Sequence, residues 1–259
     1  MLPSDITPLI LTYNEAPNIR RTLESLTWAK SIVVIDSFST DETLEILHSY
    51  SQIQVFQRKF DSFASQCNYG LGKIASEWVL SLDADYVLTD ELINEIKTLP
   101  TESDVDSYSV RFKYCIFGKP LRGTLLPPRK VLYKKQKAIY KDDGHAHRVC
   151  VEGKSSTLSA YIHHDDRKPL SRWLWAQDRY MVIEAKKIIE TPESELSFSD
   201  RIRKQKILAP LIILIYCLIL KGGILDGWHG WYYALQRVLA EILLAIRLFE
   251  YEKIQKIDM

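Results

Sequence analysis

The chain has 259 residues, of which 46% are hydrophobic and 26% are charged, and its formal net charge at pH 7 is +1. This composition is typical of folded globular proteins and excludes disordered and collagen-like classes. The length fits one large domain, or one domain with a substantial appendage. The four cysteines are widely separated and form no C-x-x-C pair, which predicts reduced thiols and argues against a disulfide framework or a cysteine zinc site.

The charges are unevenly distributed along the chain. Residues 1–110 contain 7 Lys or Arg and 17 Asp or Glu, whereas residues 111–148 contain 11 and 2. Such a basic segment favours an anionic partner, either phosphate groups or anionic lipid head groups. The sequence carries no nucleic-acid-binding signature, so we expect no nucleic-acid partner.

The first hundred residues alternate between strand and helix patterns. No basic leader precedes the first strand-like run, so we expect no signal peptide and a first domain on the cytoplasmic side. The predicted strands are 9–12, 32–35, 53–56 and 78–82, and the predicted helices are 19–26, 39–47, 64–75 and 91–97. We expect Asn14, Ser39 and Thr89 to cap helices, Ser39 in a capping box with Glu42. The alternation predicts an α/β fold with a mostly parallel sheet and helices on both faces.

The second half of the chain shows a different pattern of strands and helices. Strand patterns at 107–114 and 130–133 are followed by helical patterns at 168–189 and 228–249. Residues 207–220 lack any charge, but a bilayer span needs about 20 apolar residues. We therefore predict a catalytic domain over 1–165 and a helical appendage over 166–259, with a membrane-surface or re-entrant segment within 205–250. The alternative is a soluble helical hairpin that packs on the sheet.

Polar side chains follow several of the predicted strands. Asp36 and Asp83 stand at strand ends, Asp85 follows two residues later, and Tyr13 and Glu15 follow the first strand. Ligands of parallel α/β sheets bind beyond the carboxyl ends of the strands, so we expect these residues to converge there. A pair of carboxylates spaced two residues apart suits Mg²⁺ or Mn²⁺, which would offset the charge of a diphosphate leaving group.

Four segments resemble the family 2 glycosyltransferases, and they occur in the order found in that family. They are 11–15 (LTYNE), 33–43 (VVIDSFSTDET), 66–68 (QCN) and 78–85 (WVLSLDAD). The resemblance implies a GT-A (Rossmann-like) fold, a nucleotide-sugar donor, a divalent cation and inversion at the anomeric carbon. With the later segment 221–227 (KGGILDG), the chain is most similar to the lipopolysaccharide-core type of transferase.

The resemblance also implies roles for individual residues. Tyr13 and Glu15 would line the nucleotide pocket, and Asp36 would hydrogen-bond the base or ribose. Asp83 would face the ribose or the metal ion, and Asp85 would coordinate the metal ion. Further candidates for donor binding are Gln66, Asn68, Arg129 and Arg148. Polar helix surface remains the alternative for Gln66 and Asn68, and solvated surface for the two arginines.

We expect the catalytic base to lie in segment 141–149. Displacement at the anomeric carbon needs a carboxylate or an imidazole that deprotonates the acceptor hydroxyl. Related core transferases carry a His-Glu pair here, but this chain has no Glu in the segment. We predict Asp143 as the base, with Asp142 and His145 as alternatives; a charged turn around Gly144 is the other interpretation.

Residues 163–166 (HHDD) form a second polar cluster. Neighbouring side chains of a strand point to opposite faces, so one metal ion rarely binds both histidines. We expect a polar loop here; the alternative is that one of the histidines completes the metal coordination once the donor is bound.

These observations predict a metal-dependent enzyme that moves a hexose from a nucleotide sugar to a glycan or lipid-linked acceptor of the cell envelope, such as lipopolysaccharide. Peripheral contact with the cytoplasmic face of the inner membrane would bring it to that acceptor. Transfer to a polyprenyl phosphate and a non-catalytic membrane-peripheral binding protein are the alternatives. A nucleotidyltransferase would need a glycine-rich, lysine-containing phosphate loop, which residues 12–17 do not provide.

Overall fold

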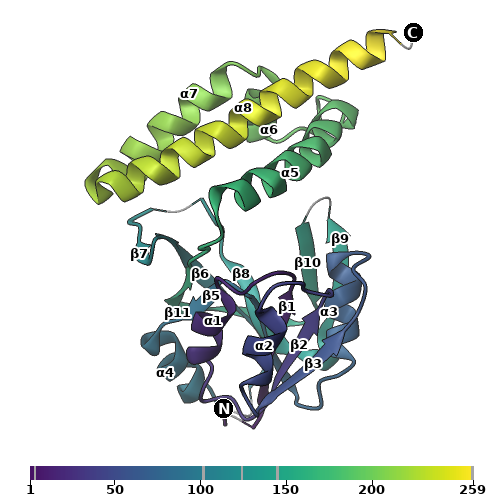
Figure 1. Ribbon diagram of the computed structural model, residues 1–259, viewed down its shortest axis with the longest axis vertical. Helices are drawn as coiled ribbons and strands as arrows, with labels where there is room; N and C mark the ends of the chain where they lie inside the picture. The colour runs from purple at the N-terminus through teal and green to yellow at the C-terminus, as the bar shows by residue number, and fades with distance from the viewer. Residues whose placement is uncertain (3, 101–102, 124, 144–145, 258–259) are drawn as a thin grey trace. The chain divides into compact units, whose positions relative to one another are not determined.

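The computed structural model describes residues 1–2, 4–100, 103–123, 125–143 and 146–257 (Figure 1). The chain divides into two compact units. Unit 1 comprises residues 1–120 and 125–167, and unit 2 comprises residues 121–124 and 168–259.

The amino-terminal half of unit 1 forms four parallel strands. They are β1 (Ile6–Thr12), β2 (Ile32–Asp36), β3 (Ile53–Gln57) and β4 (Trp78–Asp83), in the order β3-β2-β1-β4. Thr12 pairs with Asp36 of β2, and Leu11 pairs with Asp83 of β4. The register therefore places both acidic strand ends beside the end of β1, as the sequence predicts.

The sheet continues beyond β4 with mixed strand directions. The further strands are β8 (Arg129–Lys134), β6 (Val105–Ile116), β11 (Lys154–His164) and β5 (Tyr86–Leu88), while β7 (Lys119–Pro120) pairs with β6. β8 runs antiparallel to β4 and to β6, β11 runs parallel to β6, and β5 runs antiparallel to β11. A separate hairpin consists of β9 (Ala138–Asp143) and β10 (Ala146–Val151), after a 3-10 turn at Lys135–Lys137.

Helices cover both faces of the sheet in unit 1. They are α1 (Ile19–Glu24), α2 (Thr43–His48), α3 (Phe63–Leu71) and α4 (Asp90–Thr98). Side chains alternate between the faces of a strand, so Ile10 packs with α1, α2 and α4, whereas Leu9 packs with α3. The prediction of an α/β sheet covered on both faces is confirmed.

Two of the three predicted helix caps are wrong. Ser39 Oγ donates to Asp36 Oδ1 at 2.5 Å and accepts from the Asn14 amide at 2.9 Å, while α2 begins only at Thr43. Asn14 has a left-handed φ of 54° and accepts from the Thr40 amide at 2.8 Å. A hydrogen bond to a carboxylate is stronger than one between neutral groups at a helix N-terminus. Ser39 Oγ therefore binds Asp36 and does not cap a helix. The third predicted cap, Thr89, accepts from the Leu92 amide at 3.3 Å and is confirmed.

Unit 2 is helical. It contains α5 (Leu170–Glu190), α6 (Phe198–Lys204), α7 (Leu208–Ile215), a π-helical turn (Tyr216–Leu220), a 3-10 turn (Gly223–Asp226) and α8 (Trp228–Ile257). A Cβ atom at Gly230 would lie 1.8 Å from the carbonyl oxygen of Gly223, so only glycine permits this approach of α8 to the turn. The uncharged run 207–220 is split between α7 and the π-helical turn. Within the described residues, no helix has both the length and the apolar character needed to cross a bilayer.

Unit 2 buries charges and exposes apolar side chains. Arg203 lies 2.9 Å from Glu241, 3.4 Å from Glu184 and 3.6 Å from Asp200, and all three acids are buried. An apolar belt of exposed side chains runs along α7, the two turns and the start of α8. Its members are Ile207, Leu208, Leu211, Ile212, Ile215, Ile219, Leu220, Ile224, Leu225, Trp228, Trp231 and Leu235.

Candidate active site

Asp83 is the last residue of β4, Asp85 lies in the short loop between β4 and β5, and strand β11 ends beside this loop. His164 pairs with Tyr86 of β5, and the Asp165 amide donates to the Asp85 carbonyl at 3.0 Å. The side chains follow the backbone, because His164 Nε2 lies 3.0 Å from Asp85 Oδ2. Both side chains are less than a fifth exposed. The expected polar loop at 163–166 is therefore wrong at its first half, since pairing with β5 and β6 extends β11 through His164.

The surroundings of His164 are aromatic and acidic. Its ring packs edge-on against Tyr86 and Tyr114, with centroid distances of 5.2 and 4.7 Å. Burial disfavours the charged ring, but the Asp85 carboxylate together with those of Asp83 and Asp166 outweighs burial, so the pKa of His164 lies above its usual value. Burial also raises the pKa of the Tyr86 hydroxyl, and Asp83 adds to that rise. The loop is thus a partly desolvated site with excess negative charge.

Asp85 and His164 are the side chains at this loop that could hold a divalent cation. Among the described residues, no three His, Cys, Asp or Glu side chains are arranged to hold a metal ion. Asp85 and His164 bring one oxygen and one nitrogen together at 3.0 Å. Mg²⁺ and Mn²⁺ sites of this kind use one or two protein ligands and take the others from water and substrate phosphates. The pair fits a cation that arrives with a phosphate-bearing substrate.

Asp36 occupies the predicted strand end, but its carboxylate is engaged by the protein. The residue is fully buried. Thr12 Oγ1 donates to Oδ1 at 2.9 Å, and the Ser39 amide donates to Oδ2 at 2.9 Å. Gln57 Nε2 lies 3.4 Å from Oδ2. These contacts tie the loops after β1, β2 and β3 together, and a contact from Asp36 to a ligand stays a prediction.

The loop after β1 presents Tyr13 and Glu15. The Tyr13 side chain is exposed, while the Glu15 amide donates to Thr43 Oγ1 at 2.8 Å. Glu15 Oε2 accepts from Asn18 Nδ2 at 3.0 Å. On the neighbouring loop, Phe38 is exposed and has a left-handed φ of 60°, which no sequence pattern predicts. A bulky residue in that region is rare, and only the tertiary structure reveals it.

Gln66 and Asn68 lie on α3 and support neighbouring segments. Gln66 is 1% exposed, accepts from Arg58 at 2.9 Å and donates to Ser37 Oγ at 3.0 Å. The Asn68 amide group is exposed and exchanges two hydrogen bonds of 3.0 Å with the backbone of Tyr140 in β9. Their contact with a nucleotide stays a prediction. Arg129 is exposed and donates to the Tyr86 hydroxyl at 3.2 Å, which places it beside the Asp83 loop.

Two of the candidates for the catalytic base, Asp142 and Asp143, are the last two residues of β9. The backbones of Asp142 and Asp143 pair with β10, but their side chains, like that of Arg148, lie outside the described part of the structure. His145 lies outside the described residues altogether. The hairpin itself is anchored, because the Tyr140 hydroxyl donates to Ser81 Oγ at 2.7 Å, two residues before Asp83.

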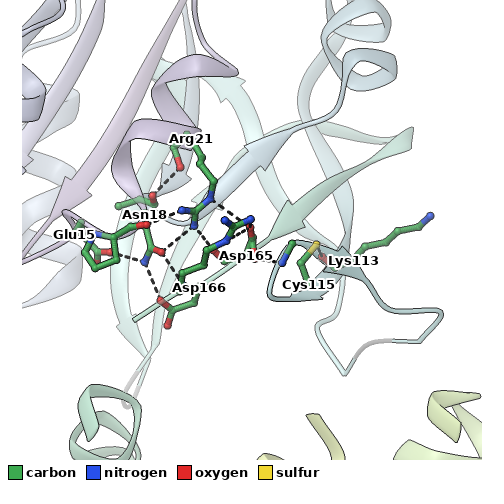
Figure 2. A network of polar contacts seen from close by, with 12 residues as sticks. Glu15, Asn18, Arg21, Lys113, Cys115, Asp165 and Asp166 are labelled. Atoms are coloured by element: carbon green, nitrogen blue, oxygen red, sulfur yellow. Dashed lines mark hydrogen bonds and ion pairs between the residues drawn. The ribbon is translucent and has the colours of Figure 1, made fainter. Parts of the chain in front are cut away.

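A polar network that the sequence did not predict joins the segment after β11 to the loop after β1. Figure 2 shows Asn18 and Arg21 in contact with Asp165 and Asp166. No short motif indicates it, because the partners are more than 140 positions apart. The four residues stand beside His164 and Glu15, and so border the candidate site.

Comparisons with known proteins agree with this geometry. The family model described as "Glycosyl transferase family 2" matches residues 9–152. An uncharacterized glycosyltransferase, RP128 of Rickettsia prowazekii, is 31% identical over 104 residues, which are 40% of this chain and 35% of that protein. The lipopolysaccharide core biosynthesis glycosyltransferase LpsC of Rhizobium meliloti is 28% identical over 109 residues, 40% of each chain. The match thus spans little more than a third of the length of these relatives.

One solved structure resembles the whole chain in fold. S. aureus TarS 1-349 in complex with UDP-GlcNAc has a TM-score of 0.51 and 17% identity, and the likeness covers 96% of this chain and 92% of that one. At this level of identity, the likeness concerns the fold.

Proposed function

The chain belongs to glycosyl transferase family 2, and on this premise we propose that it moves a sugar from a nucleotide-sugar donor to an acceptor hydroxyl. The predicted family resemblance is confirmed, and the α/β fold is GT-A-like. One observation carries the proposal: Asp85 at the end of the β4 loop contacts His164 at 3.0 Å, beside the strand ends that belong to the matched family segment.

The donor is proposed to lie across the carboxyl ends of β1, β2 and β4. Tyr13, Glu15 and Asp36 surround the proposed nucleoside position, and Asp83 stands at the end of β4, next to the proposed diphosphate position. Asp85 and His164 would hold the divalent cation, and the imidazole favours Mn²⁺ over Mg²⁺. When bound, the cation would neutralise charge on the departing diphosphate. Arg129 adds a guanidinium beside this loop.

The acceptor hydroxyl is proposed to lose its proton to Asp143, with Asp142 and His145 as alternatives. The acceptor oxygen then bonds to the anomeric carbon as the bond from that carbon to the diphosphate oxygen breaks, which inverts the configuration. Tyr140 supports this step indirectly, because its hydroxyl and backbone hold β9 against β4 and α3.

The proposed acceptor is a glycan or lipid-linked glycan of the cell envelope, such as the lipopolysaccharide core. The similarity to LpsC and the basic segment 111–148 support this choice. The same basic segment suits a polyprenyl phosphate acceptor, which is the second candidate. Mild acid separates the two, because it cleaves a glycosyl phosphate product and spares a glycoside.

Unit 2 is proposed to lie at the surface of the cytoplasmic face of the inner membrane through the apolar belt. Exposed leucine, isoleucine and tryptophan side chains suit the interfacial zone of a bilayer, and in sequence Lys204 precedes the belt while Lys221 lies within it. We expect Leu220→Glu with Leu225→Glu to abolish co-sedimentation with vesicles of phosphatidylethanolamine and phosphatidylglycerol. Val182→Glu with Ile183→Glu is the matched control, because these side chains are exposed on α5 outside the belt. Equal binding by wild type and both variants would contradict membrane contact through the belt.

The function is tested with a panel of nucleotide sugars, uridine nucleotides first, with and without Mn²⁺. A bound donor raises the melting midpoint by mass action. Asp85→Asn keeps the shape of the side chain and should lower metal-dependent turnover by about 100-fold or more. Asp104→Asn, an exposed acid paired with Lys154 at the start of β6, should leave turnover unchanged. Full turnover in excess chelator, or full activity of Asp85→Asn, would contradict the metal assignment.

A further inference from the structure

The Asn18 side chain is 1% exposed and uses its complete hydrogen-bonding capacity (Figure 2). Its Nδ2 donates to Glu15 Oε2 at 3.0 Å and to Asp166 Oδ1 at 2.8 Å. Its Oδ1 accepts from Arg21 at 3.0 Å and from the Arg167 amide at 2.8 Å. An amide side chain has two N–H donors and two acceptor lone pairs, so no capacity is left.

Asp165 forms the second half of this network. Its side chain is buried, and Oδ1 accepts from the Gly118 amide at 3.1 Å. Oδ2 accepts from Arg167 Nε at 2.9 Å and lies 3.4 Å from Arg21 Nε. The Asp165 carbonyl oxygen accepts from Arg21 at 2.7 Å. Two guanidinium groups and a backbone amide thus hold one buried carboxylate in a single position.

The network joins two functional segments that are far apart in sequence. Asp165 directly follows His164, which contacts Asp85. Asn18 precedes α1 and holds the side chain of Glu15. The same few hydrogen bonds therefore determine where the end of β11 lies relative to the loop after β1.

We propose that Asn18 and Asp165 are positioning residues that couple nucleotide binding to metal binding. They fix the position of His164 relative to Glu15. A nucleotide bound at the loop after β1 then places its diphosphate next to a cation at Asp85 and His164. The inference rests on the proposed function, which places Glu15 in the nucleotide pocket and the cation at Asp85 and His164.

Contacts outside the network already hold α1 and β11 in the fold of unit 1. α1 already packs through Ile19 and Leu23, which are fully buried in the main core of unit 1. β11 is held by backbone pairing to β6 and β5. Loss of the network should therefore leave unit 1 folded while the end of β11 gains freedom relative to the loop after β1.

The test measures the affinity of the full chain for UDP by calorimetry, with and without Mn²⁺. In wild type, Mn²⁺ should increase the affinity. Asn18→Asp keeps the size of the side chain but removes both donors and puts a carboxylate between Glu15 and Asp166. We expect the fold-increase from Mn²⁺ to shrink roughly fivefold or more, since couplings between sites commonly span about 5- to 150-fold. Asp165→Asn, which weakens the other half of the network, should shrink it as well.

Two further variants separate positioning from stability. Asp106→Asn alters a buried carboxylate of unit 1 that contacts Lys134 and Lys137, so it should lower the melting midpoint and keep the full gain from Mn²⁺. Asn18→Asp combined with Asp166→Asn again sets an amide opposite a carboxylate, and should recover part of the gain.

The outcomes distinguish this inference from the proposed function. An undiminished gain in Asn18→Asp and Asp165→Asn would overturn the inference alone. So would an equal loss of gain in Asp106→Asn, or unfolding of both network variants, because the role would then be structural. A wild-type chain whose affinity for UDP, GDP, CDP and ADP is independent of Mn²⁺ and Mg²⁺ would overturn the proposed metal site, and the inference with it.

Discussion

The buried Asp36 of unit 1 and the buried acids around Arg203 of unit 2 are held in different ways. In unit 1, the buried Asp36 carboxylate is held by hydroxyl and amide donors of Thr12 and Ser39. In unit 2, Arg203 stands among three buried carboxylates. Directional hydrogen bonds fix single atoms in place, which suits a binding site. A charge cluster instead holds helices together, and its strength depends on every member being present.

The two units also differ in the side chains that they expose. Most of the large exposed apolar side chains among the described residues belong to unit 2, while its acids Glu184, Asp200 and Glu241 are buried. In unit 1, the exposed aromatic residues Tyr13, Phe38 and Phe60 follow the ends of β1, β2 and β3. These three aromatic residues of unit 1 thus stand where a ligand is expected, whereas a fourth, Phe117, follows β6. The exposed apolar side chains of unit 2 are spread over its helices and turns.

We expect the largest loss of stability from a substitution at the centre of the charge cluster of unit 2. Arg203→Met removes the guanidinium that pairs with the three buried carboxylates and leaves them facing one another, which should cost about 3–5 kcal/mol. Arg247→Met is the control, because Arg247 on α8 pairs with the partly exposed Asp178 and Glu250 and should cost less than about 1 kcal/mol. The free energy of unfolding in denaturant measures both. Equal losses would remove the proposed distinction between the cluster and ordinary surface pairs.

A neutral hydrogen-bond chain in unit 1 should respond more mildly. Tyr140→Phe keeps the ring but removes the hydroxyl that bonds to Ser81 Oγ at 2.7 Å and to the Tyr133 hydroxyl at 2.8 Å. The expected cost is about 1–3 kcal/mol, because buried partners lose their hydrogen bonds. Tyr133→Phe removes only one of the two bonds and should cost less, as chemical denaturation would show. The reverse order would contradict this account of the chain.

A gain of stability is expected at the end of β2. Phe38 has a φ of 60°, a conformation that costs an ordinary residue about 1–2 kcal/mol but glycine almost nothing. Phe38→Gly should therefore raise the free energy of unfolding by up to about 1 kcal/mol, even though an aromatic side chain is lost. Phe60→Gly is the control: this exposed residue has no positive φ, so stability should fall slightly. A loss at Phe38 equal to that at Phe60 would show that no strain is stored there.

The stability that Asp106 contributes should depend on pH. Hydrogen bonds from Lys137 and Lys134 lower the pKa of Asp106 to about 2, against the opposing effect of burial. A carboxylate whose pKa is lower in the folded state than in the unfolded state stabilises the fold at pH values above its unfolded pKa of about 3.9. This contribution is lost as the pH falls toward 2. The difference in melting midpoint between wild type and Asp106→Asn should be constant from pH 6 to 8 and shrink between pH 4 and 2. A constant difference down to pH 2 would contradict the shift.

The sequence by itself determined the four parallel strands and, to within about four residues at their ends, the four helices of the first hundred residues, but not the short strand β5. It also determined that Asp36 and Asp83 stand at strand ends and that Asp85 follows two residues later. Hydrophobic periodicity is a local property, and each of these acids stands within a few residues of the apolar run that defines its strand. The same locality explains the family resemblance, because its motifs are short and contiguous.

Only the tertiary structure decided which polar groups meet. His164 reaches Asp85 across 79 positions because β11 pairs with β5, and Ser39 binds Asp36 where a helix cap was expected. Asn68 contacts the backbone of β9, and Asn18 contacts the segment after β11. Such partners depend on strand register and on the packing of distant segments. Local patterns carry no information about either, because a hydrogen bond depends on distances in space and not on spacing along the chain.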